Sequence, residues 1–299
     1  MKIFYSFLFL TLVFSCNREH TGEGKNNNYS LSIDSRNRSF TVYSPMNFDE
    51  NKEYPVLLAL HGRYGNPKNM AKMTNFNPLA DEHDFLIVYP KGFRRSWNDG
   101  RGEGPAAEND IDDVKFMKGI VGFLKANYPI NENKLFVSGM SNGGFMTMRL
   151  ACEMSETFKA FISVTGSLST DFDCNPSTPI NLMLIAGTDD ELVPYNGGEV
   201  ASSESFSIGF KDLLNNWSEI NNCTNFTEEN LPQNHDDGTS VIKFTHKDCD
   251  NDVENILYQI NNGGHTWPSG NNFFGENTTG INSKELNASE EIISFCLSL

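Results

Sequence analysis

The chain has 299 residues and a formal net charge of −16 at pH 7, so it is long enough for one large domain or two small ones. Binding to a phosphate backbone requires a basic surface, so this balance argues against a nucleic-acid partner. It favours a neutral substrate over a polyanionic one, although the acidic surface could equally serve solubility alone.

Residues 1–15 are predicted to be a signal peptide. Lys2 supplies a short positive region, and the apolar run Ile3–Phe14 is too short to span a bilayer. A serine before Cys16 resembles a bacterial lipobox, which predicts lipidation of Cys16 and an exported cell-envelope lipoprotein, periplasmic or at the cell surface. A soluble secreted protein is the alternative. The polar segment 16–28 is predicted to be a disordered tether.

From residue 29 the pattern alternates between strands and helices. Tyr29–Ile33 and Ser39–Tyr43 alternate apolar and polar residues, which predicts an antiparallel hairpin. Apolar runs that suit strands of a mostly parallel sheet are Val56–Leu60, Phe85–Tyr89, Leu135–Val137, Ala160–Val164, Ile180–Ala186 and Val253–Ile260. Helices are predicted over Asp112–Tyr128, Gly144–Cys152, Ser203–Ile220 and Glu285–Leu299. This alternation predicts a single α/β domain over residues 29–299.

Five cysteines lie within this predicted domain, and export makes disulfide bonds possible. Cys152 and Cys174 flank a strand-containing segment, whereas Cys223 and Cys249 flank a loop rich in Asn, Asp and Glu. Pairing each cysteine with its neighbour would close two loops, each worth about 3 kcal/mol by the loop-entropy argument. The spacing alone leaves this connectivity open. Cys296, in the apolar C-terminal helix, is predicted to be a buried thiol.

The long irregular segment Lys91–Asn109 follows a predicted strand. Ligands in open parallel sheets bind beyond the carboxyl ends of the strands. Irregular loops of this length in compact domains tend to be functional or disordered. We therefore expect this segment to overhang the site.

The most informative motif is Gly139-Met140-Ser141-Asn142-Gly143, which reads G-x-S-x-G. It lies between a predicted strand and a predicted helix, the context of a nucleophile elbow. In such an elbow the serine sits on a tight, strained turn, and the flanking glycines let the strand and the helix approach closely. The motif predicts that Ser141 is a nucleophile.

A serine nucleophile needs a base, and the base needs an orienting acid. Among six histidines, His265 lies in a glycine-rich turn after the last predicted strand, which suits the chain order Ser…Asp…His. Three adjacent acidic residues follow the strand at 180–186. Asp190, which begins a D-x-x-V-P turn, is favoured over Asp189, and Glu191 is expected to face solvent.

An oxyanion hole needs two preorganised backbone N–H groups. One is expected from Asn142, at the start of a helix whose dipole favours negative charge. The other is expected from Arg63, in the loop after the first parallel strand, with the Tyr64 N–H as the alternative. For the Arg63 side chain, a surface ion pair is favoured over contact with an acidic group of the substrate.

At this point the chain resembles a family, the secreted α/β-hydrolase esterases that include feruloyl and acetylxylan esterases and polyhydroxybutyrate depolymerase-like proteins. The matching segments run in the family's order: Leu60-His61-Gly62, Trp97-Asn98, Asp112-Asp113-Val114, Gly139-Met140-Ser141-Asn142-Gly143-Gly144, Gly187-Thr188-x-Asp190-x-x-Val193-Pro194-Tyr195 and Gly263-Gly264-His265-Thr266-Trp267-Pro268.

The resemblance implies the α/β-hydrolase fold and a triad of Ser141, Asp190 and His265, which moves Asp190 well ahead of Asp189. It also implies two disulfides, which pair Cys152 with Cys174 and Cys223 with Cys249. The sequence departs from the family at Arg63-Tyr64, where small residues or cysteine are common, and this departure puts the shape of the pocket in question rather than the chemistry.

The implied activity is ester hydrolysis through an acyl-enzyme, with no metal and no cofactor. Feruloyl or acetyl esters on plant-type polysaccharides are the expected substrates, and short polyhydroxyalkanoate esters are the alternative. Trp97, Trp267 and Tyr64 are candidate substrate contacts, the two tryptophans as a stacking surface for a sugar or phenolic acid. The partners expected are a small-molecule or polysaccharide-linked ester and a membrane only through the lipid on Cys16, and the protein is expected to be a monomer.

Two other classes of protein compete with this interpretation. A non-catalytic surface binding protein on a hydrolase scaffold would be expected to have lost a triad residue, and Ser141, Asp190 and His265 are all present. A serine peptidase of the same fold would usually carry a large extra domain, for which this chain has no residues to spare.

Overall fold

The computed structural model describes residues 24–299, so the predicted signal peptide, Cys16 and residues 17–23 lie outside the described residues. Ten strands form one sheet, in the spatial order β1 (Lys25–Ile33), β2 (Arg36–Ser44), β4 (Leu86–Pro90), β3 (Tyr54–Leu60), β5 (Ile130–Met140), β6 (Ala160–Val164), β7 (Asn181–Gly187), β12 (Asn255–Asn261), β11 (Ser240–Lys247) and β10 (Asn225–Asn230). The six strands from β4 to β12 in this order run parallel, and two antiparallel strands flank them at each edge. A short separate pair consists of β8 (Gly198–Glu199) and β9 (Phe206–Ser207).

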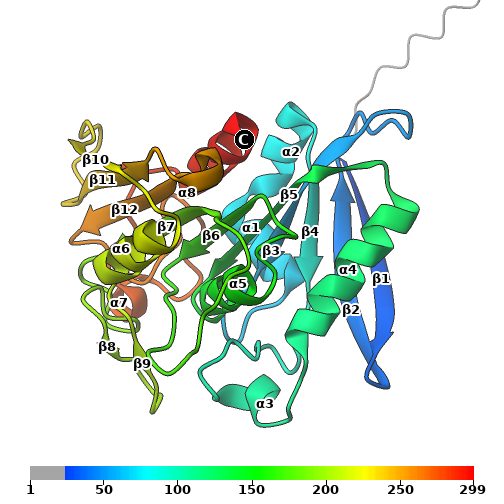
Figure 1. Ribbon diagram of the computed structural model, residues 1–299, viewed down its shortest axis with the longest axis horizontal. Coiled ribbons are helices and arrows are strands. Elements are labelled where there is room, and N and C mark those ends of the chain that lie inside the picture. Colours follow the sequence, from blue (N-terminus) through cyan, green and yellow to red (C-terminus); the bar gives the residue numbers. More distant parts are fainter. Residues whose placement is uncertain (1–23) are drawn as a thin grey trace, which may run out of the picture.

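Helices cover both faces of the sheet (Figure 1). The α-helices are α1 (Pro67–Thr74), α2 (Phe76–His83), α3 (Gly104–Ala107), α4 (Asp113–Asn127), α5 (Asn142–Glu153), α6 (Phe210–Ile220), α7 (Glu276–Thr279) and α8 (Ala288–Ser298). Buried side chains of α4, α5 and α6 form one core with the sheet, and those of α1, α2 and α8 form a second core on the opposite face. No helix among residues 24–299 is long and apolar enough to cross a membrane.

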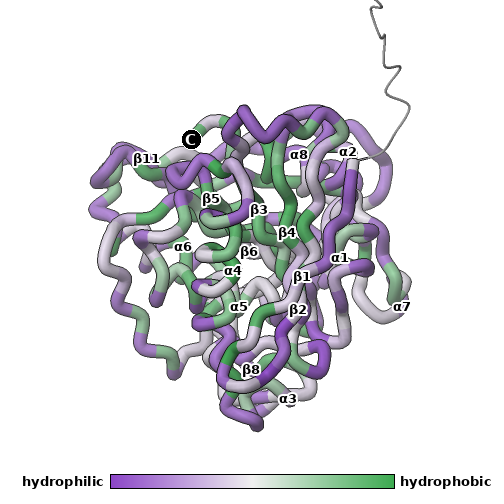
Figure 2. The backbone as a smooth tube through the Cα atoms, turned by 90° about the vertical axis from the view of Figure 1, so that its right-hand side faces the viewer, coloured by the Kyte–Doolittle hydropathy of each residue, from purple (hydrophilic) through white to green (hydrophobic). Residues whose placement is uncertain are grey.

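The central strands are buried on both faces, which explains their apolar composition. Every residue of β4, β6 and β7 is buried, as expected for parallel strands sandwiched between helices. Figure 2 shows β3 and β4 as mostly hydrophobic segments inside a more hydrophilic periphery. The parallel order and the helices on both faces confirm the predicted fold class.

The edges of the sheet differ from the sequence-based expectation. β1 begins at Lys25, so residues 25–28, expected in the tether, pair with β2 through the register Lys25↔Ser44 to Asn28↔Thr41. The expected acidic loop between Cys223 and Cys249 contains the antiparallel pair β10 and β11. All six residues of β10 are exposed, so that strand carries no apolar pattern that would reveal it.

Two helical segments also differ from the expectation. The helix expected from Ser203 begins only at Phe210, and the residues before it include β9. The helices α1 and α2 were not predicted. Asn66 caps α1 by accepting the Asn69 N–H at 3.0 Å, and Pro67 occupies its first turn.

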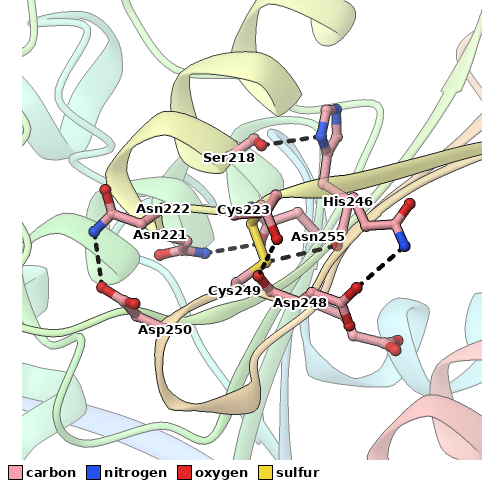
Figure 3. The surroundings of a disulfide bond; sticks show 12 residues. Ser218, Asn221, Asn222, Cys223, His246, Asp248, Cys249, Asp250 and Asn255 are labelled. Carbon is pink, nitrogen blue, oxygen red and sulfur yellow. Dashed lines mark hydrogen bonds between the residues drawn. A yellow bond between two sulfur atoms is a disulfide. The ribbon is translucent and has the colours of Figure 1, made fainter.

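The structure contains both disulfides that the resemblance implied. Cys152 at the end of α5 is bonded to Cys174, and Cys223 after α6 is bonded to Cys249 after β11. Figure 3 shows the second disulfide among polar side chains. The side-chain amide of Asn255, at the start of β12, lies 3.8 Å from Sγ of Cys223. Cys296 is a buried free thiol, as predicted, and burial raises its pKa above the usual value.

Candidate active site

A cavity of about 480 Å³ opens at the carboxyl edge of the parallel strands. Its lining comes from segments that follow β3, β5, β7 and β12, which are far apart in the sequence. Ligands of open α/β sheets bind at this edge because the connections leaving parallel strands meet there. Ser141 and His265 both line this cavity.

Ser141 occupies the sharp turn between β5 and α5. Its backbone has φ 55° and ψ −122°, a conformation that is strained for a residue with a side chain. A Cβ at Gly139 would overlap the backbone carbonyl of Gly143, and a Cβ at Gly143 would overlap that of Leu60. Only glycine permits this close packing, so the G-x-S-x-G pattern has the geometry of a nucleophile elbow.

Asp190 and His265 form a buried hydrogen-bonded pair. The Nδ1 atom of His265 lies 2.7 Å from Oδ2 of Asp190, and both side chains are buried. The other carboxylate oxygen accepts the backbone N–H groups of Leu192 and Val193, each at 2.8 Å. The carboxylate is therefore fixed from both sides, and a proton on Nδ1 leaves Nε2 of His265 free to act as a base.

The neighbouring acidic residues do not contact the histidine. Asp189 is exposed, and its carboxylate accepts a hydrogen bond from the Thr188 hydroxyl at 3.0 Å. Glu191 is exposed, as expected. The structure thus brings His265 together with Asp190 and leaves the other two acidic residues outside.

Two backbone N–H groups near Ser141 are candidate donors to an oxyanion. Asn142 is the first residue of α5, so its N–H has no acceptor within the helix. The Arg63 N–H makes no hydrogen bond within residues 24–299, whereas the Tyr64 N–H donates to the Arg95 carbonyl at 2.9 Å. The Tyr64 N–H is thus already engaged, and the Arg63 N–H is the better candidate for the second donor.

A neutral histidine anchors the loop that carries Arg63. The Nε2 atom of His61 accepts the Gly92 N–H at 3.0 Å, so its Nδ1–H donates to the Gly62 carbonyl at 2.8 Å. Burial lowers the pKa of His61 to about 4, which keeps this tautomer uncharged at neutral pH. Gly62 lies against Ser141, because a Cβ at Gly62 would be 3.4 Å from the serine Cβ.

Trp97 is a support beneath the site and not a stacking surface for substrate. Its side chain is fully buried, its Nε1–H donates to the His61 carbonyl at 2.7 Å, and its ring packs 4.9 Å from the imidazole. Its backbone N–H and C=O bond the side-chain amide of Asn142 at 2.9 and 3.1 Å. The prediction that Trp97 contacts substrate is therefore wrong, because its contacts bury it against the elbow and the loop after β3.

The loop at 91–109 is fixed to the protein by a polar network. The Asn142 amide also donates to Asp99 Oδ2 at 2.6 Å, and that carboxylate forms a 2.6 Å ion pair with Arg101. Asp113 in α4 accepts the Asn98 N–H at 2.8 Å and pairs with Arg38 at 2.5 Å. Arg95 and Arg101 line the cavity, so part of the loop borders the site as expected. Trp97 and Asn98, by contrast, bond to side chains of α5 and α4.

The aromatic surface of the cavity comes from other residues. Trp267 lines the cavity but is only 2% exposed, and its Nε1–H donates to Ser289 Oγ at 2.9 Å. Tyr64, by contrast, is 61% exposed. Sequence reasoning missed Phe273 and Phe274, which line the cavity and are 49% and 65% exposed. Two consecutive aromatic residues within an Asn- and Gly-rich stretch were the available signal.

A mostly parallel sheet with helices on both faces, and an elbow serine beside a His–Asp pair, defines the class of α/β-hydrolases. A family model described as "Putative esterase" matches residues 30–240. This match covers more than half of the sequence, and the chain therefore belongs to this esterase family.

The relatives whose names state an activity are distant in sequence. "Putative esterase NocK" of Nocardia uniformis is 26% identical over 81% of this chain and 74% of its own length. "Feruloyl esterase B" of Piromyces equi is 23% identical over 76% of this chain, which spans only 42% of that relative. The solved structure of "Acetyl xylan esterase from Aspergillus awamori" has a TM-score of 0.55, at 13% identity over 80% of this chain and 94% of that one. This last likeness supports the fold.

Proposed function

We propose that this protein is a serine esterase that hydrolyses feruloyl or acetyl esters carried by polysaccharides. The observation that carries the proposal is the buried contact of 2.7 Å between His265 Nδ1 and Asp190 Oδ2, in the same cavity as the strained elbow serine. Membership of the esterase family and the feruloyl and acetylxylan esterases among the similar proteins support the substrate class.

The mechanism proceeds in two halves. His265 Nε2 takes the Ser141 proton as the serine Oγ bonds to the ester carbonyl carbon, and the N–H groups of Asn142 and Arg63 hold the resulting oxyanion. The ester C–O bond then breaks, and the alcohol leaves with the proton held by His265. Water, activated by the same histidine, releases the acid and restores Ser141, while Asp190 holds the imidazole in one tautomer.

The direct test is hydrolysis of p-nitrophenyl acetate by the wild type and by Ser141→Ala. Loss of a triad residue costs about 10⁴–10⁶ in kcat, so the variant should be almost inactive. It should also fail to react with a fluorophosphonate probe that labels the wild type. Retention of more than a few per cent of the activity would refute the assignment, and absence of labelling in the wild type would favour a binding protein.

The substrate class is tested with three ester types assayed side by side. Methyl ferulate and acetylated xylan represent the proposed esters, and a short polyhydroxyalkanoate ester represents the alternative. We expect kcat/KM to be higher for at least one of the first two. A clear preference for the polyhydroxyalkanoate ester would overturn the proposed substrates while leaving the esterase chemistry intact.

We further propose that the protein is exported, with lipidation of Cys16 and a monomeric domain. The two disulfides support an oxidising compartment, where such bonds persist. Fractionation and intact-mass measurement of the wild type and Cys16→Ser test the lipid, because the variant should be released in soluble form without the lipid mass. Size-exclusion chromatography with light scattering tests the monomer.

A further inference from the structure

A basic groove of about 1280 Å³ lies beside the active-site cavity. Its lining comes from α1, from the β1–β2 hairpin and from the segment after β4, and Figure 2 shows α1, β1 and β2 on the same side of the molecule. Five basic residues line the groove and no acidic residue does: Lys68, Lys72, Lys91, Arg94 and Arg95. We call this surface the basic groove.

The charges of the basic groove are not neutralised by neighbours. All five basic side chains are exposed, and none takes part in an ion pair within residues 24–299. The chain as a whole has 39 acidic residues against 23 lysines and arginines. The charge of the basic groove is therefore opposite in sign to the net charge of the protein, and it creates a local positive field.

The basic groove and the active-site cavity both lie against α1 and share Arg95 in their linings. Lys68 and Lys72 lie on the side of α1 that lines the groove, whereas Met70 and Met73 line the cavity. Arg95 lines both spaces, and its Nε–H donates to the Gly65 carbonyl at 3.3 Å, in the loop that carries the candidate oxyanion donor. A ligand lying in the groove would thus reach the edge of the catalytic cavity.

The cavity itself extends this positive character. Arg63 and Arg101 line it, and no Asp or Glu residue does. Arg101 is paired with Asp99, but the Nε atom of Arg63 is buried without a hydrogen-bond partner in the described part of the chain. The surface ion pair expected for Arg63 is therefore absent within residues 24–299.

We propose that the basic groove binds an anionic stretch of the polysaccharide that carries the ester, and that Arg95 marks where the polysaccharide enters the cavity. Guanidinium groups pair with carboxylate and sulfate oxygens in a forked geometry, and lysines add compact positive charges. Asn26 and Asn28 in β1 line the groove as well and offer amides to sugar hydroxyls. The groove is larger than the cavity, as suits a polymer segment. This inference rests on the proposed esterase function.

Binding is tested first, with polymers that carry no ester. Polygalacturonic acid supplies carboxylates, dextran sulfate supplies sulfates and unsubstituted xylan is the neutral comparison, each titrated against the Ser141→Ala protein at low and high salt. We expect binding to at least one anionic polymer, weakened by salt because screening reduces exposed charge interactions. The polymer that binds more tightly identifies the anionic group.

The double variant Lys68→Gln/Lys72→Gln removes two groove charges, and Lys118→Gln/Lys159→Gln removes two exposed charges elsewhere. We expect about tenfold weaker binding of the anionic polymer in the first and no change in the second, since each exposed contact contributes modestly. Equal binding by both variants would overturn the proposal, as would binding to phosphatidylglycerol vesicles but to neither anionic polymer.

The catalytic counterpart separates this inference from the proposed function. At equal acetyl content, kcat/KM should be higher for acetylated polygalacturonic acid than for acetylated xylan. The ratio of the first kcat/KM to the second should fall about tenfold in Lys68→Gln/Lys72→Gln. Wild type inactive on p-nitrophenyl acetate would refute the esterase function. If the wild type hydrolyses p-nitrophenyl acetate but the kcat/KM ratio is equal in Lys68→Gln/Lys72→Gln and Lys118→Gln/Lys159→Gln, the role of the basic groove is refuted and the esterase function stands.

Discussion

Replacing Trp97 by phenylalanine separates a supporting role from a substrate-stacking role for this residue. The indole is completely buried, and its Nε1–H donates to the His61 carbonyl at 2.7 Å. Phenylalanine keeps an aromatic ring beside the imidazole but removes the donor. The His61 carbonyl then loses a buried hydrogen bond at the residue that anchors the loop next to Ser141.

The structure sets the size of the expected effects. A buried acceptor left without its partner costs about 1–3 kcal/mol, which should appear as a loss of unfolding free energy. Rotation of the peptide group after His61 would also displace the candidate oxyanion donor of Arg63. Loss of one such donor costs about 10²–10³ in kcat, and this range is the ceiling for the variant because the loop retains the imidazole hydrogen bonds.

The assay combines urea unfolding with kinetics on p-nitrophenyl acetate and on methyl ferulate. We expect Trp97→Phe to lower kcat by a similar factor for both esters, with little change in the ratio of their KM values. Trp217→Phe, which alters another fully buried tryptophan outside the cavity lining, is the control for stability loss alone. A selective rise in KM for methyl ferulate would refute the supporting role.

Three further predictions follow from buried polar groups. Asp190→Asn should lower kcat on p-nitrophenyl acetate about 10⁴-fold by favouring the wrong tautomer, and a loss below tenfold would contradict the triad. Burial lowers the pKa of His61 to about 4, so the unfolded chain binds its proton first as pH falls below about 6.5. The free energy of unfolding of the wild type should therefore fall between pH 6.5 and 4 in urea unfolding, and His61 accounts for at most about 3 kcal/mol of that loss. The exposed-site control His235→Gln should lose as much as the wild type, whereas His61→Gln should lose less and keep only the share of His246, whose pKa burial also lowers. Asp113→Ala strands the buried Arg38 and should cost about 3–5 kcal/mol in urea unfolding, so a loss below 1 kcal/mol would exclude a structural ion pair.

The buried elements of the fold could be predicted from the sequence because burial leaves a local pattern. The strand expected over Ala160–Val164 is found with the same bounds, and the helix expected over Asp112–Tyr128 spans Asp113–Asn127. The strand is an apolar run because it is buried on both faces, and in the helix the apolar residues recur with the helical period. The polar strands β1 and β10 pair through their backbones at the edges of the sheet, so side-chain periodicity did not reveal their full extent.

The candidate triad could be predicted because each residue sits at a recognisable junction between a strand and its following turn. The G-x-S-x-G motif places Ser141, and the glycine-rich turn places His265. The aromatic residues were harder to assign, since tryptophan serves both buried packing and stacking on ligands. Only its tertiary contacts distinguish these roles, and they bury Trp97 under the loop.

The sequence by itself determined the class of fold, the elbow serine and the order of the residues proposed to act with it, because these depend on local geometry and short spacings. The tertiary structure decided which carboxylate meets His265, which N–H groups remain free beside Ser141 and which aromatic rings stay exposed. It also brought Lys68, Lys91 and Arg95 into one groove of an acidic protein. Net charge sums over the whole chain, whereas the field at a site depends on which side chains the fold gathers there.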